Sequence, residues 1–160
     1  MKVTITWCCF IILLAGFING CGSLDGFDQA KKVAKNFFED RYENGGAGSD
    51  EFYSKVFWDN TDASQWRNIQ KVVDLSLGEL LSYTLVSWNM QDQLPTSQLS
   101  GTFAVLVFEN KYEKGSGREK LTLLQRSGWA EFEIVGHQFD SQLINEMVLN
   151  GIAKAAEQNA

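Results

Sequence analysis

T-F-A-V-L-V-F-E-N-K-Y, residues 102–112, is the stretch that decides the fold. Its side chains alternate between two faces, as they do in a β-strand. One face carries Ala104, Leu106, Phe108 and Tyr112, and the other carries Phe103, Val105 and Val107. Because both faces are apolar over the first half, we expect this strand to be covered on both sides there.

Similar patterns on either side of this stretch predict three more strands. Residues 80–90 are rich in Tyr, Thr, Val and Trp, which favour strands. Residues 113–117 contain two glycines and predict a hairpin loop, after which residues 118–126 alternate again. A Ser-Gly turn then leads to a last strand at 129–139, with Phe132 and Ile134 on one face. Short turns between consecutive strands predict an antiparallel sheet.

A period of 3.6 residues predicts helices before and after the sheet. The first helix is expected to begin at Asp25 as N-cap and to end in the glycine-rich residues 44–49. Two shorter helices are expected at 51–58 and 63–75, and a final one is expected after Asp140 or Ser141. The predicted apolar stripe of 63–75 is Trp66, Ile69, Val72 and Val73, and that of the final helix is Leu143, Ile144, Met147, Val148 and Ile152. The fold class is therefore α+β, with N-terminal helices packed on a curved four-stranded antiparallel sheet and a C-terminal helix.

The first 21 residues predict export and a lipid anchor. Lys2 precedes an apolar run from Val3 to Ile18, which is typical of a signal peptide. Ile18-Asn19-Gly20-Cys21 resembles the lipobox of bacterial lipoproteins, which implies cleavage between Gly20 and Cys21 and a lipid on the Cys21 thiol. We therefore divide the chain into a signal at 1–20, a lipidated tether at 21–24 and one α+β domain at 25–160. An uncleaved membrane anchor and an ordinary secretory signal are the alternatives. Since residue 22 is not Asp, the outer membrane is favoured in a Gram-negative host.

Composition limits the classes of partner. The precursor carries a net charge of −6, and removal of the signal makes it more acidic, which argues against nucleic acid. All three cysteines lie within the first 21 residues, so the domain has no internal disulfide and no cysteine metal site. The glycines at 45–48 lack the Lys-Ser/Thr of a phosphate-binding loop. We expect no cofactor and no metal.

A set of core and turn residues in the second half of the chain carries a resemblance: Trp66, Leu77-Gly78-Glu79-Leu80, Leu94-Pro95, residues 101–108, residues 119–123 and Ile134-Val135-Gly136. In these residues the chain resembles a small family of bacterial secreted proteins and lipoproteins of unknown function. This family is grouped with the cystatin-like and nuclear-transport-factor-2-like cone folds. The resemblance covers 63–139 and implies a cone with a cavity between sheet and helices, although a shared fold does not confer a function. Phe132 stands where the family tends to have Trp, and the C-terminal helix is an addition.

Few residues suggest catalysis. His137 is the only histidine, and we place it at a rim or an interface rather than in a catalytic role. A possible pocket is formed by Glu109, Glu131, Glu133 and Trp129, where a carboxylate buried among aromatic side chains could act as a base. A solvated sheet face is the alternative for these acids. We therefore expect a membrane-anchored envelope lipoprotein with a non-catalytic domain that binds a protein partner, not an enzyme. The alternative is a small-molecule binder that uses the cone cavity, with a carboxylate-base enzyme as a more remote one.

Overall fold

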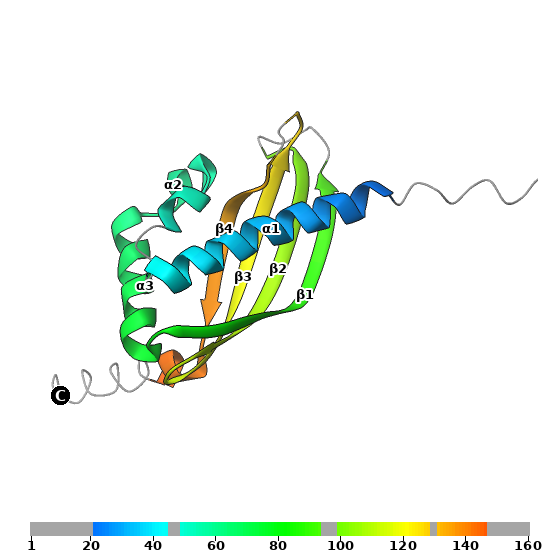
Figure 1. Ribbon diagram of the computed structural model, residues 1–160. Coiled ribbons are helices and arrows are strands. Elements are labelled where there is room, and N and C mark those ends of the chain that lie inside the picture. Colours follow the sequence, from blue (N-terminus) through cyan, green and yellow to red (C-terminus); the bar gives the residue numbers. More distant parts are fainter. Residues whose placement is uncertain (1–20, 45–48, 94–98, 129–130, 147–160) are drawn as a thin grey trace, which may run out of the picture.

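The computed structural model describes residues 21–44, 49–93, 99–128 and 131–146. Three α-helices and a short 3₁₀ turn precede four strands (Figure 1). The helices are α1 (Cys21–Asn44), α2 (Lys55–Asn60) and α3 (Ala63–Leu77), and the 3₁₀ turn η1 is Ser49–Phe52. The strands are β1 (Leu80–Gln93), β2 (Gly101–Tyr112), β3 (Gly115–Arg126) and β4 (Glu133–Asp140). Residues 142–146 are helical as well.

The sheet confirms the predicted meander. Its strands lie in the order β1-β2-β3-β4, and each neighbouring pair is antiparallel. The β2–β3 hairpin is tight, since Tyr112 pairs with Gly115 at one end and Gly101 pairs with Arg126 at the other. Local sequence therefore builds the sheet without long connections between partners.

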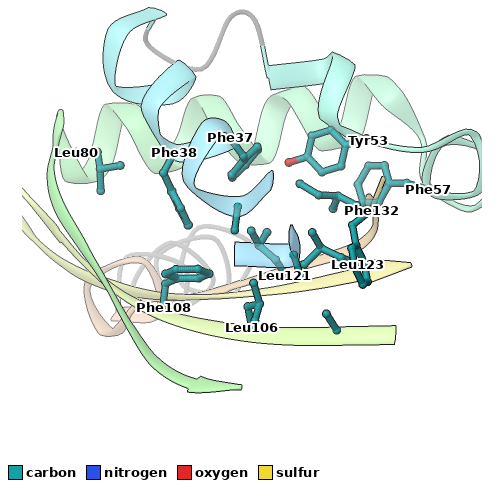
Figure 2. Packing of buried hydrophobic residues seen from close by; sticks show 14 of the residues in the cluster. Phe37, Phe38, Tyr53, Phe57, Leu80, Leu106, Phe108, Leu121, Leu123 and Phe132 are labelled. Carbon is teal, nitrogen blue, oxygen red and sulfur yellow. The ribbon is translucent and has the colours of Figure 1, made fainter. Parts of the chain in front are cut away.

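Helix α1 crosses one face of the sheet, while α2 and α3 lie at one side of it (Figure 1). Figure 2 shows the core that fills the space between helices and sheet. Phe37 and Phe38 of α1 are completely buried and face Leu106 and Phe108 of β2. Phe38 meets Phe108 with ring centroids 4.7 Å apart. The remaining large side chains of this core come from β3, α2 and α3: Leu121, Leu123, Phe57, Trp66, Val73 and Leu77.

Side chains and one glycine set the ends of the short helices. Ser54 Oγ accepts the Phe57 backbone N–H at 3.2 Å, and Asp62 Oδ1 accepts the Gln65 N–H at 2.8 Å. Both are N-caps that satisfy backbone donors at the start of a helix. Gly78 ends α3 with a φ of 77°, and a Cβ there would clash with the carboxylate of Glu113. Glycine is required at this position for both reasons.

The α+β class, with helices on an antiparallel sheet and a C-terminal helix, is confirmed, but several boundaries differ. Helix α1 begins at Cys21, so Asp25 lies inside it and the predicted tether at 21–24 is helical in its backbone. Cap preferences amount to only about 1 kcal/mol, which a favourable continuation of the helix can outweigh. Strand β4 begins at Glu133 rather than at residue 129.

The predicted apolar stripe of α3 is only half correct. Trp66 and Val73 are buried, but Ile69 and Val72 are exposed, and Leu77 takes their place in the core. Helical periodicity identifies apolar positions, but it does not say which of two adjoining apolar faces the rest of the domain covers. In the final helix, Leu143 and Ile144 pack against the core, while Met147, Val148 and Ile152 lie outside the described residues.

Candidate functional site

The structure does not bring the predicted pocket residues together. Glu109 faces away from the core, half-exposed, and forms a 2.7 Å ion pair with Arg118. Glu131 is exposed, and Glu133 is partly buried opposite Leu124 at the other end of β3. Arg118 and Leu124 are six residues apart on β3, which separates the two acids by about 20 Å. Trp129 lies outside the described residues.

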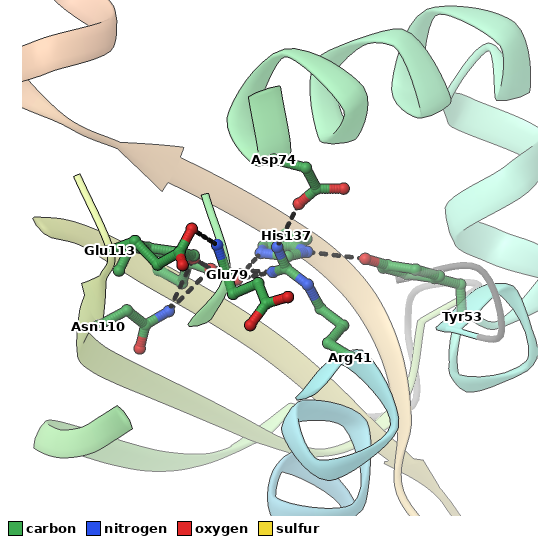
Figure 3. Close-up of polar contacts among 9 residues, drawn as sticks. Arg41, Tyr53, Asp74, Glu79, Asn110, Glu113 and His137 are labelled. Atoms are coloured by element: carbon green, nitrogen blue, oxygen red, sulfur yellow. Dashed lines mark hydrogen bonds and ion pairs between the residues drawn. The ribbon is translucent and has the colours of Figure 1, made fainter. Parts of the chain in front are cut away.

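A different set of polar side chains converges inside the domain. We call it the Glu119 network, and Figure 3 shows it close up. Each of its members comes from α1, from the segment after η1, or from β2, β3 or β4. They are Arg41, Tyr53, Asn110, Tyr112, Glu119 and His137. The network therefore links the β2–β3 hairpin to three segments that are distant from it in the sequence: α1, the segment after η1, and β4.

The Glu119 carboxylate accepts hydrogen bonds on both of its oxygens. Oε1 accepts from Tyr112 Oη at 2.6 Å and from Asn110 Nδ2 at 2.8 Å. Arg41 Nη1 lies 2.9 Å from each oxygen, and His137 Nε2 lies 2.8 Å from Oε2. Glu119 is 0% exposed, so these contacts replace all of its hydration. This carboxylate is fully satisfied by the protein.

His137 connects the carboxylate to a phenol. Its Nδ1 lies 2.8 Å from the Tyr53 hydroxyl, while its Nε2 contacts Glu119. A carboxylate only accepts hydrogen bonds, so Nε2 carries a proton; in a neutral ring, Nδ1 then accepts the Tyr53 O–H. The ring lies 5.0 Å from Trp66 and 5.6 Å from Phe37, centroid to centroid. Aromatic packing and two hydrogen bonds therefore fix its orientation.

Burial and the Arg41 charge set the ionisation of the network. Burial alone would raise the pKa of Glu119, but the Arg41 charge and the His137 and Tyr112 contacts hold it at about 2. Burial would lower the pKa of Arg41, yet the charge of Glu119 raises it above its usual value. Burial raises the pKa of both Tyr53 and Tyr112. At neutral pH Glu119 and Arg41 therefore form an ion pair, and Tyr53 and Tyr112 are neutral phenols.

The arrangement has the order of a carboxylate–imidazole–hydroxyl triad but not its accessibility. Glu119 orients His137, which in turn contacts Tyr53, as a general base contacts a nucleophile. However, the side chain of His137 is 3% exposed, and Tyr53 is buried against Phe57 and Trp66. The Tyr53 hydroxyl is therefore shielded by its neighbours among the described residues. The hydrogen bonds of the network link α1 and the segment after η1 to the sheet.

Two partly open clefts among the described residues adjoin the network. The lining of one, of about 550 Å³, includes Asn110 of the network and Glu109, and the lining of the other, of about 320 Å³, includes Arg41 and Tyr112. Four carboxylates also line the smaller cleft, those of Glu43, Asp74, Glu79 and Glu113, and the Asp74 carboxylate lies 3.6 Å from Arg41 Nη2. Small-molecule sites are mostly apolar with a few polar groups, and the surface of this lining is divided about evenly between polar and apolar atoms. Within the described residues, no group of three or more His, Cys, Asp or Glu side chains is placed to hold a metal ion.

Sequence reasoning missed the Glu119 network, although one signal was present. Glu119 occupies the same strand face as Leu121 and Leu123, and Asn110 lies between Phe108 and Tyr112 on the inner face of β2. Arg41 follows Phe37 and Phe38 at helical spacing. An acidic residue on the apolar face of a strand, together with a basic residue on the apolar face of a helix, predicts a buried ion pair.

The expected rim or interface position of His137 is wrong because β4 contains a bulge. Ile134 pairs with Leu123 and His137 pairs with Leu121, so one extra residue lies opposite the Thr122–Leu123 step. Strict alternation from Ile134 would turn His137 away from the core. A bulge shifts every following side chain to the other face, and His137 therefore points inward.

The outer surface of α3 is the second notable feature. Ile69, Val72 and Leu75 are 48%, 47% and 67% exposed, and we call them the α3 apolar row. Their spacing of three residues places them along one side of the helix. The adjoining side carries Trp66, Val73 and Leu77 into the core.

Comparison with known proteins adds no relative. No family model, no curated protein and no solved structure matches this chain. The resemblance to the cystatin-like lipoprotein family therefore stays a prediction, and the function has to be argued from the residues themselves.

Proposed function

We propose that this chain is a bacterial envelope lipoprotein, lipidated on Cys21 after cleavage behind Gly20, whose domain binds a protein partner without catalysis. The observation that carries the binding role is the α3 apolar row. The proposed export and lipid anchoring, which we call the address of the protein, rest on the lipobox-like residues 18–21 and the apolar run before them. Within the described residues, no helix is both long and apolar enough to span a membrane.

The α3 apolar row supports a protein contact because α3 is apolar on two adjoining sides. A helix on the surface of a domain normally presents one apolar stripe to the core and polar residues to water. Here one side already packs into the core, so Ile69, Val72 and Leu75 add exposed apolar surface that no described residue of the domain covers. Contiguous apolar surface of this kind marks interaction sites.

The burial of the Glu119 network supports a non-catalytic role. Its ionisable groups are the most perturbed in the described part of the chain, which is a common property of active sites. Yet Arg41, Glu119 and His137 have side chains 6%, 0% and 3% exposed. Ionisable groups that contact one another and are shielded from water in this way are typical of a structural ion pair, and the His137–Tyr53 contact is not open to a substrate.

The test is chemical crosslinking in native membranes followed by affinity recovery of the protein. Wild type is compared with Val72→Lys, which places a charge in the α3 apolar row. Val86→Lys is the matched control, because Val86 is a β1 valine of almost the same exposure, 45% against 47%. We expect one crosslinked protein with wild type and Val86→Lys, and at least a tenfold loss with Val72→Lys.

The address is tested on the same preparations. Wild-type protein should carry an N-terminal lipid by mass spectrometry and sediment with membranes, whereas Cys21→Ser should carry none and stay in the soluble fraction. Equal recovery of a partner by Val72→Lys and Val86→Lys would contradict the α3 contact, and absence of lipid on wild-type Cys21 would contradict the address.

A further inference from the structure

The first turns of α1 and the second half of β1 form an exposed aromatic contact. Phe27 of α1 stacks on Trp88 of β1, with ring centroids 4.4 Å apart and an angle of 29° between the rings. Beside them, a Cβ on Gly26 would lie 3.2 Å from the Met90 methyl group, so helix and strand are in close contact there. Trp88 nevertheless remains 47% exposed. The stack fixes its ring at the surface.

This contact lies close to the proposed lipid. Helix α1 is continuous from Cys21 through Phe27, six residues later. At the helical rise of about 1.5 Å per residue, Phe27 is about 9 Å along the axis from Cys21. No flexible spacer separates them. A lipid on Cys21 would therefore hold this end of the domain at the polar layer of the bilayer, which is about 5–8 Å thick on each side.

We infer that the Phe27–Trp88 pair inserts into the headgroup layer of the membrane and sets the orientation of the domain on it. The inference rests on the proposed lipidation of Cys21. A tryptophan ring with one apolar side and one N–H is the side chain most suited to this layer. The lipid keeps the protein on the membrane, and Trp88 provides a second point of contact with it.

The charges around the pair indicate that this contact is apolar rather than ionic. Asp25 and Asp28 are exposed on the first turns of α1, Lys31 and Lys32 are exposed one turn later, and Asp92 is exposed on β1 four residues after Trp88. Acids outnumber bases here, so anionic lipid gains nothing over zwitterionic lipid. Membrane contact of Trp88 therefore needs neither low salt nor anionic lipid.

Orientation also has a consequence for the proposed binding surface. α2 and α3 lie at the opposite end of the sheet from the start of α1 (Figure 1). With the Phe27–Trp88 pair at the bilayer, the α3 apolar row is held away from lipid and stays free to meet a protein.

The experiment measures tryptophan quenching by lipids brominated near the headgroup end of their chains. Lipidated full-length protein is reconstituted in phosphatidylcholine vesicles, with and without the brominated lipid. Trp88→Phe removes the indole and keeps an aromatic ring against Phe27. Trp58→Phe is the control, since Trp58 belongs to α2 at the far end of the domain. The difference in fluorescence between wild type and Trp88→Phe gives the contribution of Trp88, and we expect the brominated lipid to quench this contribution at least twofold. The contribution of Trp58, obtained in the same way from Trp58→Phe, should not be quenched.

The outcomes separate the two proposals. If wild-type protein carries the lipid and floats with vesicles but Trp88 is not quenched, the membrane contact is wrong and the lipoprotein address stands. Protection of Trp88 from both lipid and aqueous quenchers, in native membranes, would mean that a protein covers it, and this also overturns the contact. If Cys21 carries no lipid, both proposals are wrong. Quenching that disappears at high salt or without anionic lipid would contradict the apolar contact.

Discussion

The Glu119 network and the α3 apolar row depart from normal burial in opposite directions. In the first, charged groups lie where water is excluded; in the second, apolar groups lie where water is present. Each buried charge is compensated, since Glu119 alone receives hydrogen bonds from four side chains. Nothing in the described part of the domain covers Ile69, Val72 and Leu75. The first departure is therefore compensated within the fold, whereas the second is left uncompensated by the described residues and is the basis of the proposed protein contact.

The largest expected effect comes from removing the cation of the network. Arg41→Met keeps most of the side-chain volume but leaves the Glu119 carboxylate buried without its ion pair. Loss of one partner from a buried pair costs about 3–5 kcal/mol. Urea unfolding monitored by circular dichroism should show this loss in the free energy of unfolding.

The control is a second Arg–Glu pair on the same sheet. Arg118→Met breaks the 2.7 Å contact with Glu109, whose side chains are 60% and 56% exposed. Exposed pairs contribute less than about 1 kcal/mol. Losses of equal size in the two variants would mean that the Glu119 network is not the structural element that its burial indicates.

The next effect is a dependence of stability on pH. The pKa of Glu119 falls from 4.5 to about 2 on folding, so between these values the unfolded state binds more protons than the folded state. The contribution is complete above about pH 5 and is lost as the pH falls through 2. It amounts to about 3 kcal/mol. We expect the free energy of unfolding to fall steeply between pH 5 and pH 2.

Glu119→Gln isolates this contribution because it removes the titrating group. The variant is less stable than wild type at pH 7, and its stability changes less between pH 5 and pH 2. Glu109→Gln should keep the wild-type slope. A Glu119→Gln variant with the full wild-type slope would show that other carboxylates cause the acid sensitivity.

The smallest effect separates the two sides of α3 with adjacent valines. Val72 is 47% exposed and Val73 is 4% exposed. Val73→Ala should reduce the free energy of unfolding by about 2 kcal/mol through lost burial. Val72→Ala should change it by no more than about 0.5 kcal/mol. Because the helix propensity changes equally in both variants, the difference measures packing alone.

Chemical denaturation of the purified domain, apart from any partner, is the measurement. A loss of 2 kcal/mol in Val72→Ala would place that side chain in the core and remove the main support for a binding surface on α3. Small effects in both variants would show that α3 as a whole contributes little to stability.

Strand periodicity predicted the sheet because each strand pairs with its neighbour in the chain. The inner faces of β2 and β3 carry Leu106, Phe108, Leu121 and Leu123, and period-two alternation identifies them without any knowledge of the partner strand. The same rule could not place His137. Its position depends on a bulge that forms only when β4 is paired with β3.

The sequence by itself determined the class of fold, the helix and strand order and a lipobox-like site at Cys21. These features depend on local spacing: alternation in strands, helical periodicity and a short linear motif. Only the tertiary structure decided that Arg41, Glu119 and His137 meet, and which apolar side of α3 stays exposed. Both depend on contacts between residues distant in the chain, and local sequence does not encode which element lies opposite another in space.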